Sequence, residues 1–272
     1  MYKKRNISDN SATGGEARGY YNNNVFNGDF IGILLGFVGA GGAGFIIAVL
    51  TLVFHVPIHV AVATSLTAMA FTTLSGVISH YQERNVVVKT GCVVGGFGAI
   101  GSYVGSKLGA GIPAHLLHWF TAGMLFLSAI CMLIRLFVVQ NHKELSASLS
   151  DQLSIYILGK GALLGVVTGM LAGAFGIGSA PFIQLGLMVF LGLSIRRSVG
   201  TTMLVILPIA IGGGIGYTSA GYLDYVLLVQ MLTGTMIGAY IGAKFTTYAP
   251  RVILKFSMIM TPVLAGCMLL ME

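Results

Sequence analysis

Two long stretches without a charged side chain constrain the fold of this chain more than any other feature. Residues 30–79 and 161–195 contain no Asp, Glu, Lys or Arg. A helix needs about 20 apolar residues to cross the hydrocarbon core of a membrane, so each stretch is longer than one crossing. Only 8% of the 272 residues are charged, whereas soluble domains carry about 25%. Together with a mean hydropathy of +0.88, this predicts an integral membrane protein.

Internal repetition at a fixed offset of 137 positions is the second constraint. Residues 28–135 align with residues 165–272 without a gap, and roughly two dozen positions are identical. Apolar residues match by chance, but glycine, lysine and proline at one offset are much harder to dismiss. The sequence therefore predicts two homologous repeats. The matched pairs include Gly32/Gly169, Gly36/Gly173, Gly39/Gly176, Gly41/Gly178, Thr64/Thr201, Gly101/Gly238, Gly105/Gly242, Lys107/Lys244 and Pro113/Pro250.

Each repeat contains four apolar segments. Helices are expected throughout, because lipid offers no water to unpaired backbone groups. The predicted fold class is thus an all-α polytopic membrane protein of two homologous repeats, each with about four helical segments. The domains are a disordered polar tail (1–27), a first repeat (28–138), a polar linker (139–158) and a second repeat (159–272). The expected segments are Phe30–Phe54, Val60–His80, Gly91–Ala110, His115–Val138, Gly161–Leu191, Ser198–Ala220, Leu223–Phe245 and Val252–Met271.

The number of membrane crossings is left open by the sequence. In one arrangement every segment crosses and the tail is cytoplasmic. In the other, the first segment of each repeat is a re-entrant hairpin, and the repeats have opposite orientations with the tail outside. Cytoplasmic loops are enriched in Lys and Arg, but counts of these residues favour neither arrangement clearly.

Glycine is concentrated in the first segment of each repeat. The run GFVGAGGAG, Gly36 to Gly44, has five glycines in nine residues and includes a G-x-G-x-x-G match. A nucleotide loop is excluded by context, because that fingerprint requires a soluble strand–helix unit with an acidic residue about 20 positions on, and the next carboxylate is Glu83. The flanks Phe30–Val38 and Phe45–Phe54 each span about 15 Å, half of a core about 30 Å thick.

The sequence accordingly predicts glycine-rich broken helices at the start of each repeat, near the middle of the membrane. Paired broken helices indicate a transporter binding site, and backbone N–H groups at a half-helix start hold anions. Four other sets of glycines have the small-xxx-small spacing of close helix packing: Gly32/Gly36, Gly101/Gly105, Gly165/Gly169/Gly173 and Gly238/Gly242. The candidate backbone ligands are Gly39, Gly41, Gly42, Gly44, Gly176, Gly178 and Ser179.

Two hydroxyl pairs, Thr64/Ser65 and Thr201/Thr202, occupy equivalent places in the repeats. They either bind an oxyanion or bond to the backbone of their own helices. The predicted spans lack carboxylates, which favours an anionic over a cationic substrate. Lys107 and Lys244 either attract the anion at the mouth or extend to the membrane interface.

Histidines supply the alternative functions that the sequence allows. His55, His59, His115 and His118 suggest a metal-ion carrier or channel, although no ligating Cys or carboxylate accompanies them. His80 with Glu83 is a candidate proton path. No nucleophile–base pair stands out, so we expect no enzyme and no cofactor. The net charge of +7 suits membrane loops and indicates no nucleic-acid partner.

Several motifs, taken in order, resemble the TauE/SafE sulfite exporter family. These are GFVGAGGAGFII with AVATSL and IGSYVGSKLGAGIP, and AGAFGIGSAPFI with SVGTTM and IGAYIGAKFTTYAP. The resemblance covers about Phe30 to Leu270. It implies a multi-pass carrier of the prokaryotic inner membrane that exports a small sulfur oxyanion or organosulfonate, with protons as a candidate coupling ion. The expected partners are the lipid bilayer, the anionic substrate and these protons, and a homodimer is one candidate oligomeric state.

Overall fold

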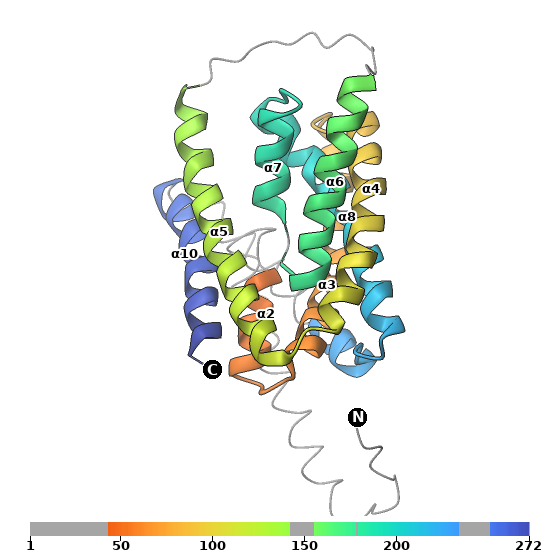
Figure 1. Cartoon of the computed structure of the whole chain (residues 1–272). Coiled ribbons are helices and arrows are strands. Elements are labelled where there is room, and N and C mark those ends of the chain that lie inside the picture. The colour runs from red at the N-terminus through yellow and green to blue at the C-terminus, as the bar shows by residue number, and fades with distance from the viewer. Residues whose placement is uncertain (1–42, 142–154, 178, 234–250, 272) are drawn as a thin grey trace, which may run out of the picture.

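The chain folds into a bundle of α-helices, shown in Figure 1. The computed structural model describes residues 43–141, 155–177, 179–233 and 251–271. Every element in this part is helical, as the sequence predicts, and residues 225–233 are also helical. The elements are α2 (Ala43–Leu52), α3 (Ile58–Gln82), α4 (Val88–Ala110), α5 (Ala114–Asn141), α6 (Ile155–Phe175), α7 (Ala180–Val189), α8 (Ile195–Ser219) and α10 (Arg251–Leu270).

Three described helices are long and apolar enough to cross a membrane, in α3, α5 and α8. By contrast, α7 has ten residues and is about 15 Å long, half of a crossing, and the described part of α2 has the same length. The predicted segment Phe30–Phe54 is described only in its α2 part. The predicted segment Gly161–Leu191 contains two helices, α6 and α7, instead of one. The tail and residues 142–154 of the expected linker lie outside the described part.

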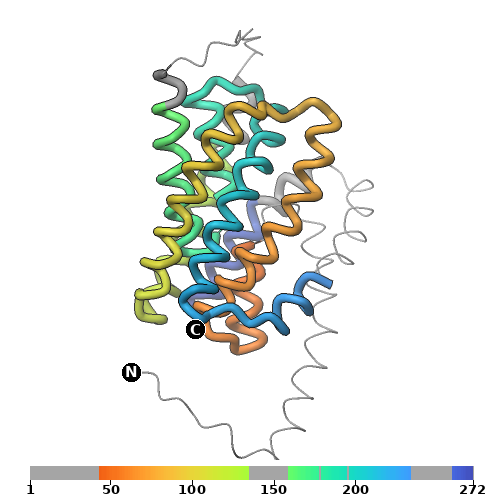
Figure 2. Tube along the Cα trace, turned by 90° about the vertical axis from the view of Figure 1, so that its right-hand side faces the viewer, coloured from red at the N-terminus to blue at the C-terminus, as the bar shows by residue number. Residues whose placement is uncertain are grey.

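α4 packs between α6 and α8, as both views of the bundle show (Figures 1 and 2), and glycines form its closest contacts. A Cβ built at Gly105 would lie 2.9 Å from Met170 Cα, and one at Gly101 would lie 3.0 Å from Val166 Cα. Only glycine allows main chains to approach this closely. The prediction that Gly101, Gly105, Gly165, Gly169 and Gly173 serve helix packing is confirmed.

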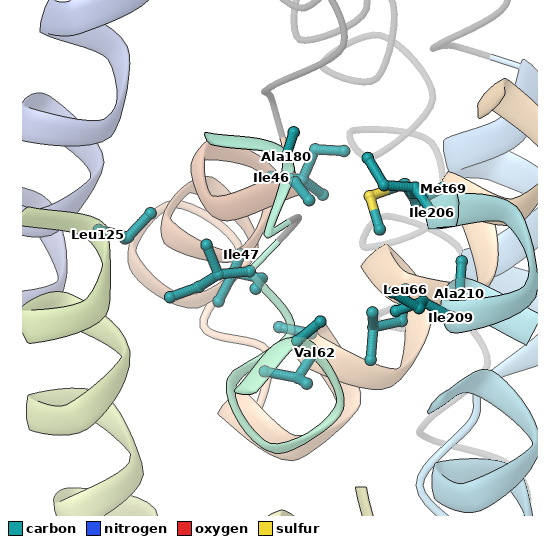
Figure 3. Packing of buried hydrophobic residues seen from close by; sticks show 14 of the residues in the cluster. Ile46, Ile47, Val62, Leu66, Met69, Leu125, Ala180, Ile206, Ile209 and Ala210 are labelled. Atoms are coloured by element: carbon teal, nitrogen blue, oxygen red, sulfur yellow. The ribbon is translucent and has the colours of Figure 1, made fainter. Parts of the chain in front are cut away.

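α3 and α8 cross the centre of the bundle side by side and in opposite directions. Gly76, near the end of α3, packs against Met203 near the start of α8, whereas Gly213 near the end of α8 packs against Leu66. α3 therefore ends where α4, α6 and α8 begin, at the top of Figure 1. The main hydrophobic core lies between these helices and the two short ones, α2 and α7 (Figure 3).

Candidate substrate-binding site

The turn between α6 and α7 reverses the chain inside the bundle. α6 ends at Phe175 and α7 begins at Ala180. Gly176 has a φ of +68°, a left-handed conformation that glycine adopts without strain. A Cβ at Gly186 would collide with Leu164, about equally far from the turn along α6. The two helices therefore form an antiparallel hairpin, whose tip we define as residues 176–179 without the undescribed residue 178.

The hairpin tip is buried against the first half of the chain. A Cβ at Gly176 would lie 2.6 Å from Val62 Cγ1 and 2.9 Å from Ile47 Cδ1. Figure 3 shows Ala180, the first residue of α7, beside Ile46 of α2. The start of α7 therefore lies next to α2, and Ser179 and Ala180 are almost fully buried there.

Ser179 is the N-cap residue of α7, and its side chain makes no capping hydrogen bond. It is only 2% exposed, and its Oγ has no hydrogen-bond partner in the described part of the chain. An N-cap serine normally accepts a bond from the first turn of its helix. The N–H groups of Ala180 and Phe182 have no acceptor four residues back within the helix, whereas Pro181 has no N–H and the Ile183 N–H donates to Ser179 O. Two backbone donors and an unpaired hydroxyl therefore lie at one buried point. Such a place suits an anion.

The four predicted hydroxyls are all fully buried but have different partners. Ser65 Oγ donates to Val62 O at 3.0 Å, and Thr202 Oγ1 donates to Ser198 O at 2.7 Å. Thr201 Oγ1 accepts from the Val87 N–H at 3.0 Å. Only the Thr64 Oγ1 has no partner. Three of the four hydroxyls therefore have backbone partners, two within their own helix and one just before α4. Of the four, Thr64 alone has a hydroxyl without a partner.

The other predicted residues are dispersed. Gly44 is buried within α2 against Leu125. Lys107 is exposed near the end of α4, with its Nζ 5.8 Å from the centroid of the Tyr103 ring. His80 Nδ1 lies 3.8 Å from the Glu83 carboxylate near the end of α3, away from the hairpin tip. Gly39, Gly41, Gly42, Gly178 and Lys244 lie outside the described residues.

Sequence reasoning missed several buried polar side chains, among them Gln184 and Ser102. Gln184 is the only amide in the charge-free stretch 161–195. It lies one turn into α7, is 7% exposed, and has an unpaired Oε1. Ser102 Oγ is likewise unpaired and faces Gly213 of α8. A lone amide in an apolar segment was a signal available for Gln184, because polar groups are costly there and mark function.

The metal-ion alternative is not favoured. Among the described residues, no group of three or more His, Cys, Asp or Glu side chains could hold a metal ion. His59 instead stacks on Tyr222, with ring centroids 4.9 Å apart, and its Nε2 lies 3.0 Å from the Ile112 carbonyl oxygen.

Tyr217 ties the hairpin to α8. It is fully buried, and its hydroxyl donates to Ala174 O, at the end of α6, at 2.9 Å. We expect Tyr217→Phe to destabilise the protein by about 1 kcal/mol, because an end carbonyl of α6 loses its partner. Tyr222→Phe is the matched control, since its bond to Ala110 O is 3.4 Å long. Thermal unfolding in detergent should show a clearly lower midpoint for Tyr217→Phe alone; equal midpoints would contradict the anchoring role.

Known proteins similar to this chain are membrane transporters. A family model described as "Sulfite exporter TauE/SafE" matches residues 26–269. The chain is 60% identical over 240 residues to the "Probable membrane transporter protein YdhB" of Bacillus subtilis (strain 168), covering 88% of this chain and 96% of the relative. It is 28% identical over 245 residues to the "Probable membrane transporter protein YjnA" of the same organism, covering 84% and 91%.

A more distant relative is the "Probable membrane transporter protein MJ0441" of Methanocaldococcus jannaschii, 27% identical over 250 residues that cover 85% of this chain and 90% of the relative. No solved structure matches the chain significantly. The transporter names of the relatives and the apolar helices agree with a multi-pass protein of the cell membrane and give no indication of an enzyme. The chain belongs to the TauE/SafE sulfite exporter family of membrane transporters.

Proposed function

We propose that this protein is a secondary transporter of a small sulfur-containing anion, such as sulfite or an organosulfonate, which it exports in exchange with or together with protons. The observation that carries the proposal is the start of α7, where the unpaired Ser179 hydroxyl is buried beside the first-turn N–H groups. These groups are hydrogen-bond donors, and the positive end of the helix dipole favours an anion there. The two carboxylates with described side chains, Glu83 and Asp224, are both exposed.

The proposed site comprises the hairpin tip, with Gly176 and Ser179, and the Thr64 hydroxyl of α3. Gln184, one turn along α7, supplies a further amide toward the interior. Gly39, Gly41, Gly42 and Gly178 remain predicted ligands by their sequence positions. Lys107 and Lys244 are predicted to attract the anion, and His80 with Glu83 to pass protons. All of these roles are proposals.

We further propose that the two halves are inverted repeats that rock against each other to give alternating access. Matching helix starts support this: α3 and α8 begin 137 positions apart, and α4 begins 137 positions before the helix over residues 225–233. The left-handed residues also match, because His55 and Arg84 precede Gly192 and Gly221 by 137 positions.

Reciprocal contacts and opposite directions support the same relation. Leu66 and Met203 are equivalent positions, and so are Gly76 and Gly213. The contact between Gly76 and Met203 therefore recurs as the contact between Gly213 and Leu66, as a two-fold axis between the halves requires. From the interior of the bundle, α7 and the described part of α2 run to opposite ends (Figure 1).

Flux into proteoliposomes tests the substrate class and the site separately. We expect saturable flux of radiolabelled sulfite or taurine that follows an imposed pH gradient. Ser179→Ala should raise the KM about tenfold, the effect of losing one hydrogen bond to a charged ligand. The unfolding midpoint should stay unchanged, because this serine makes no capping bond.

Ser219→Ala is the matched control, because its hydroxyl bonds within its own helix at the exposed end of α8. A folded wild-type protein without flux of sulfite, sulfate or taurine would contradict the substrate class. Wild-type flux with an unaltered KM in Ser179→Ala would instead contradict the site, and leave the substrate class standing.

A further inference from the structure

Basic side chains gather at one end of the bundle. Six Lys or Arg residues have described side chains, and five of them lie where α3 ends and α4, α6 and α8 begin, which we call the basic end. The sixth, Lys107, lies near the end of α4 at the opposite end. The five are Arg84, Lys89, Lys160, Arg196 and Arg197.

Direct contacts place these five residues at one level of the molecule. The Val87 N–H, between Arg84 and Lys89 in sequence, donates to Thr201 Oγ1 in the second turn of α8, which also carries both arginines in its first turn. Gly161 of α6 follows Lys160 in the sequence, and a Cβ built at Gly161 would lie 3.3 Å from Val94 Cγ2 of α4. Four of the five are exposed and Lys160 is half-buried.

In the part of the chain that the structure describes, acidic side chains are few at this end. Among described residues, Glu83 is the one carboxylate at the basic end, so the formal charge there is +4, and its partners are His80 and Asn85. At the opposite end, Lys107 and Asp224 cancel each other. Counted over the described side chains alone, the formal charges of the two ends therefore differ by four.

We propose that the basic end lies at the cytoplasmic leaflet, where its exposed arginines, Arg84, Arg196 and Arg197, bind anionic phospholipid headgroups. Lys and Arg near the ends of membrane helices set orientation, with the positive side inside. Each such residue near an anionic surface adds to the attraction. The α6–α7 hairpin then enters from the cytoplasm, and the end of α10, at the opposite end of the bundle (Figure 1), faces outward.

Cysteine labelling of intact cells tests the orientation without reference to any substrate. The background carries Ala at Cys92, Cys131 and Cys267. Ser194→Cys precedes α8 at the basic end and Ser219→Cys ends α8 at the other, and both serines are exposed. A membrane-impermeant maleimide should label Ser219→Cys in intact cells and Ser194→Cys only after permeabilisation. The reverse pattern, or equal labelling of both in intact cells, would overturn the orientation.

Reconstitution tests the lipid partner. In vesicles of phosphatidylglycerol the wild-type protein should unfold at a temperature higher than in phosphatidylcholine. The double variant Arg196→Gln/Arg197→Gln should reduce this difference by about 4 °C. Lys107→Gln, at the opposite end, should leave it unchanged. An identical lipid dependence in the wild-type protein and the double variant would overturn headgroup binding at the basic end.

Discussion

Gly173→Ala should lower the free energy of unfolding by about 3 kcal/mol, the upper range for overpacking in a core. A Cβ at this position would lie 2.8 Å from both Ser102 C and Ser102 Cα in α4. These are main-chain atoms of a neighbouring helix, so no side-chain rotation can make room. The two helices must separate, and Gly169, which meets Gly98 in the same manner, loses its packing as well.

Gly96→Ala provides the matched control for this prediction. Gly96 also lies inside α4, but a Cβ there has no neighbour within 4 Å. Because alanine is the better helix former, this variant should be stabilised by up to about 1 kcal/mol. The midpoints of thermal unfolding, followed by size-exclusion chromatography in detergent, should move in opposite directions. Similar midpoints for the two variants would show that the main chains of α4 and α6 do not touch.

Gly176→Ala should destabilise the protein by about 3 kcal/mol and reduce transport. The left-handed φ of +68° costs a non-glycine residue about 1–2 kcal/mol. The new Cβ also lies 2.6 Å from Val62 Cγ1, and a valine in a helix has almost no other rotamer to adopt. The hairpin tip must therefore move, and Ser179 moves with it.

Gly192→Ala is a control that separates the backbone strain of a left-handed residue from the collision of a new Cβ with its neighbours. Gly192 has nearly the same φ, +64°, but nothing lies within 4 Å of a Cβ there. This variant should lower the free energy of unfolding only by the backbone strain, about 1 kcal/mol, and leave the flux rate at its wild-type value. Unfolding midpoints and proteoliposome flux of the two variants decide the matter. Equal losses in both would mean that the tip of the hairpin has no packing role.

The helical segments were predictable because lipid permits few other structures, and α3, α4, α5 and α8 extend only one to three residues beyond most of the predicted limits. The reversal of the chain within residues 161–191 could not be predicted from the sequence. The sequence left a hairpin and a crossing both open, because α6 is apolar on all sides and its periodicity indicates no direction. The contact of Gly186 with Leu164 shows that the segment is a hairpin. A local sequence pattern does not reveal a contact between residues 22 positions apart.

The candidate site shows the same division. Residue type alone marked Thr64 and Thr201 as equivalent hydroxyls, yet Thr201 bonds to Val87 and Thr64 does not have a partner. Whether a buried hydroxyl is available to a ligand thus depends on backbone groups that are far away in the sequence. Val87 and Thr201, for example, are 114 positions apart. Gln184 is not marked by the internal repeat, because the equivalent position in the first half is Ile47.

The two faces of α4 differ in side-chain volume more than in polarity. Its buried residues are glycines, two serines and one valine, whereas its bulky apolar side chains project outward. Lipid is as apolar as leucine, so association here depends on close contact between main chains. A prediction that placed the most hydrophobic face of α4 toward the core would therefore orient this helix wrongly, by half a turn about its axis. The outward residues are Phe97, Ile100, Tyr103, Val104 and Leu108.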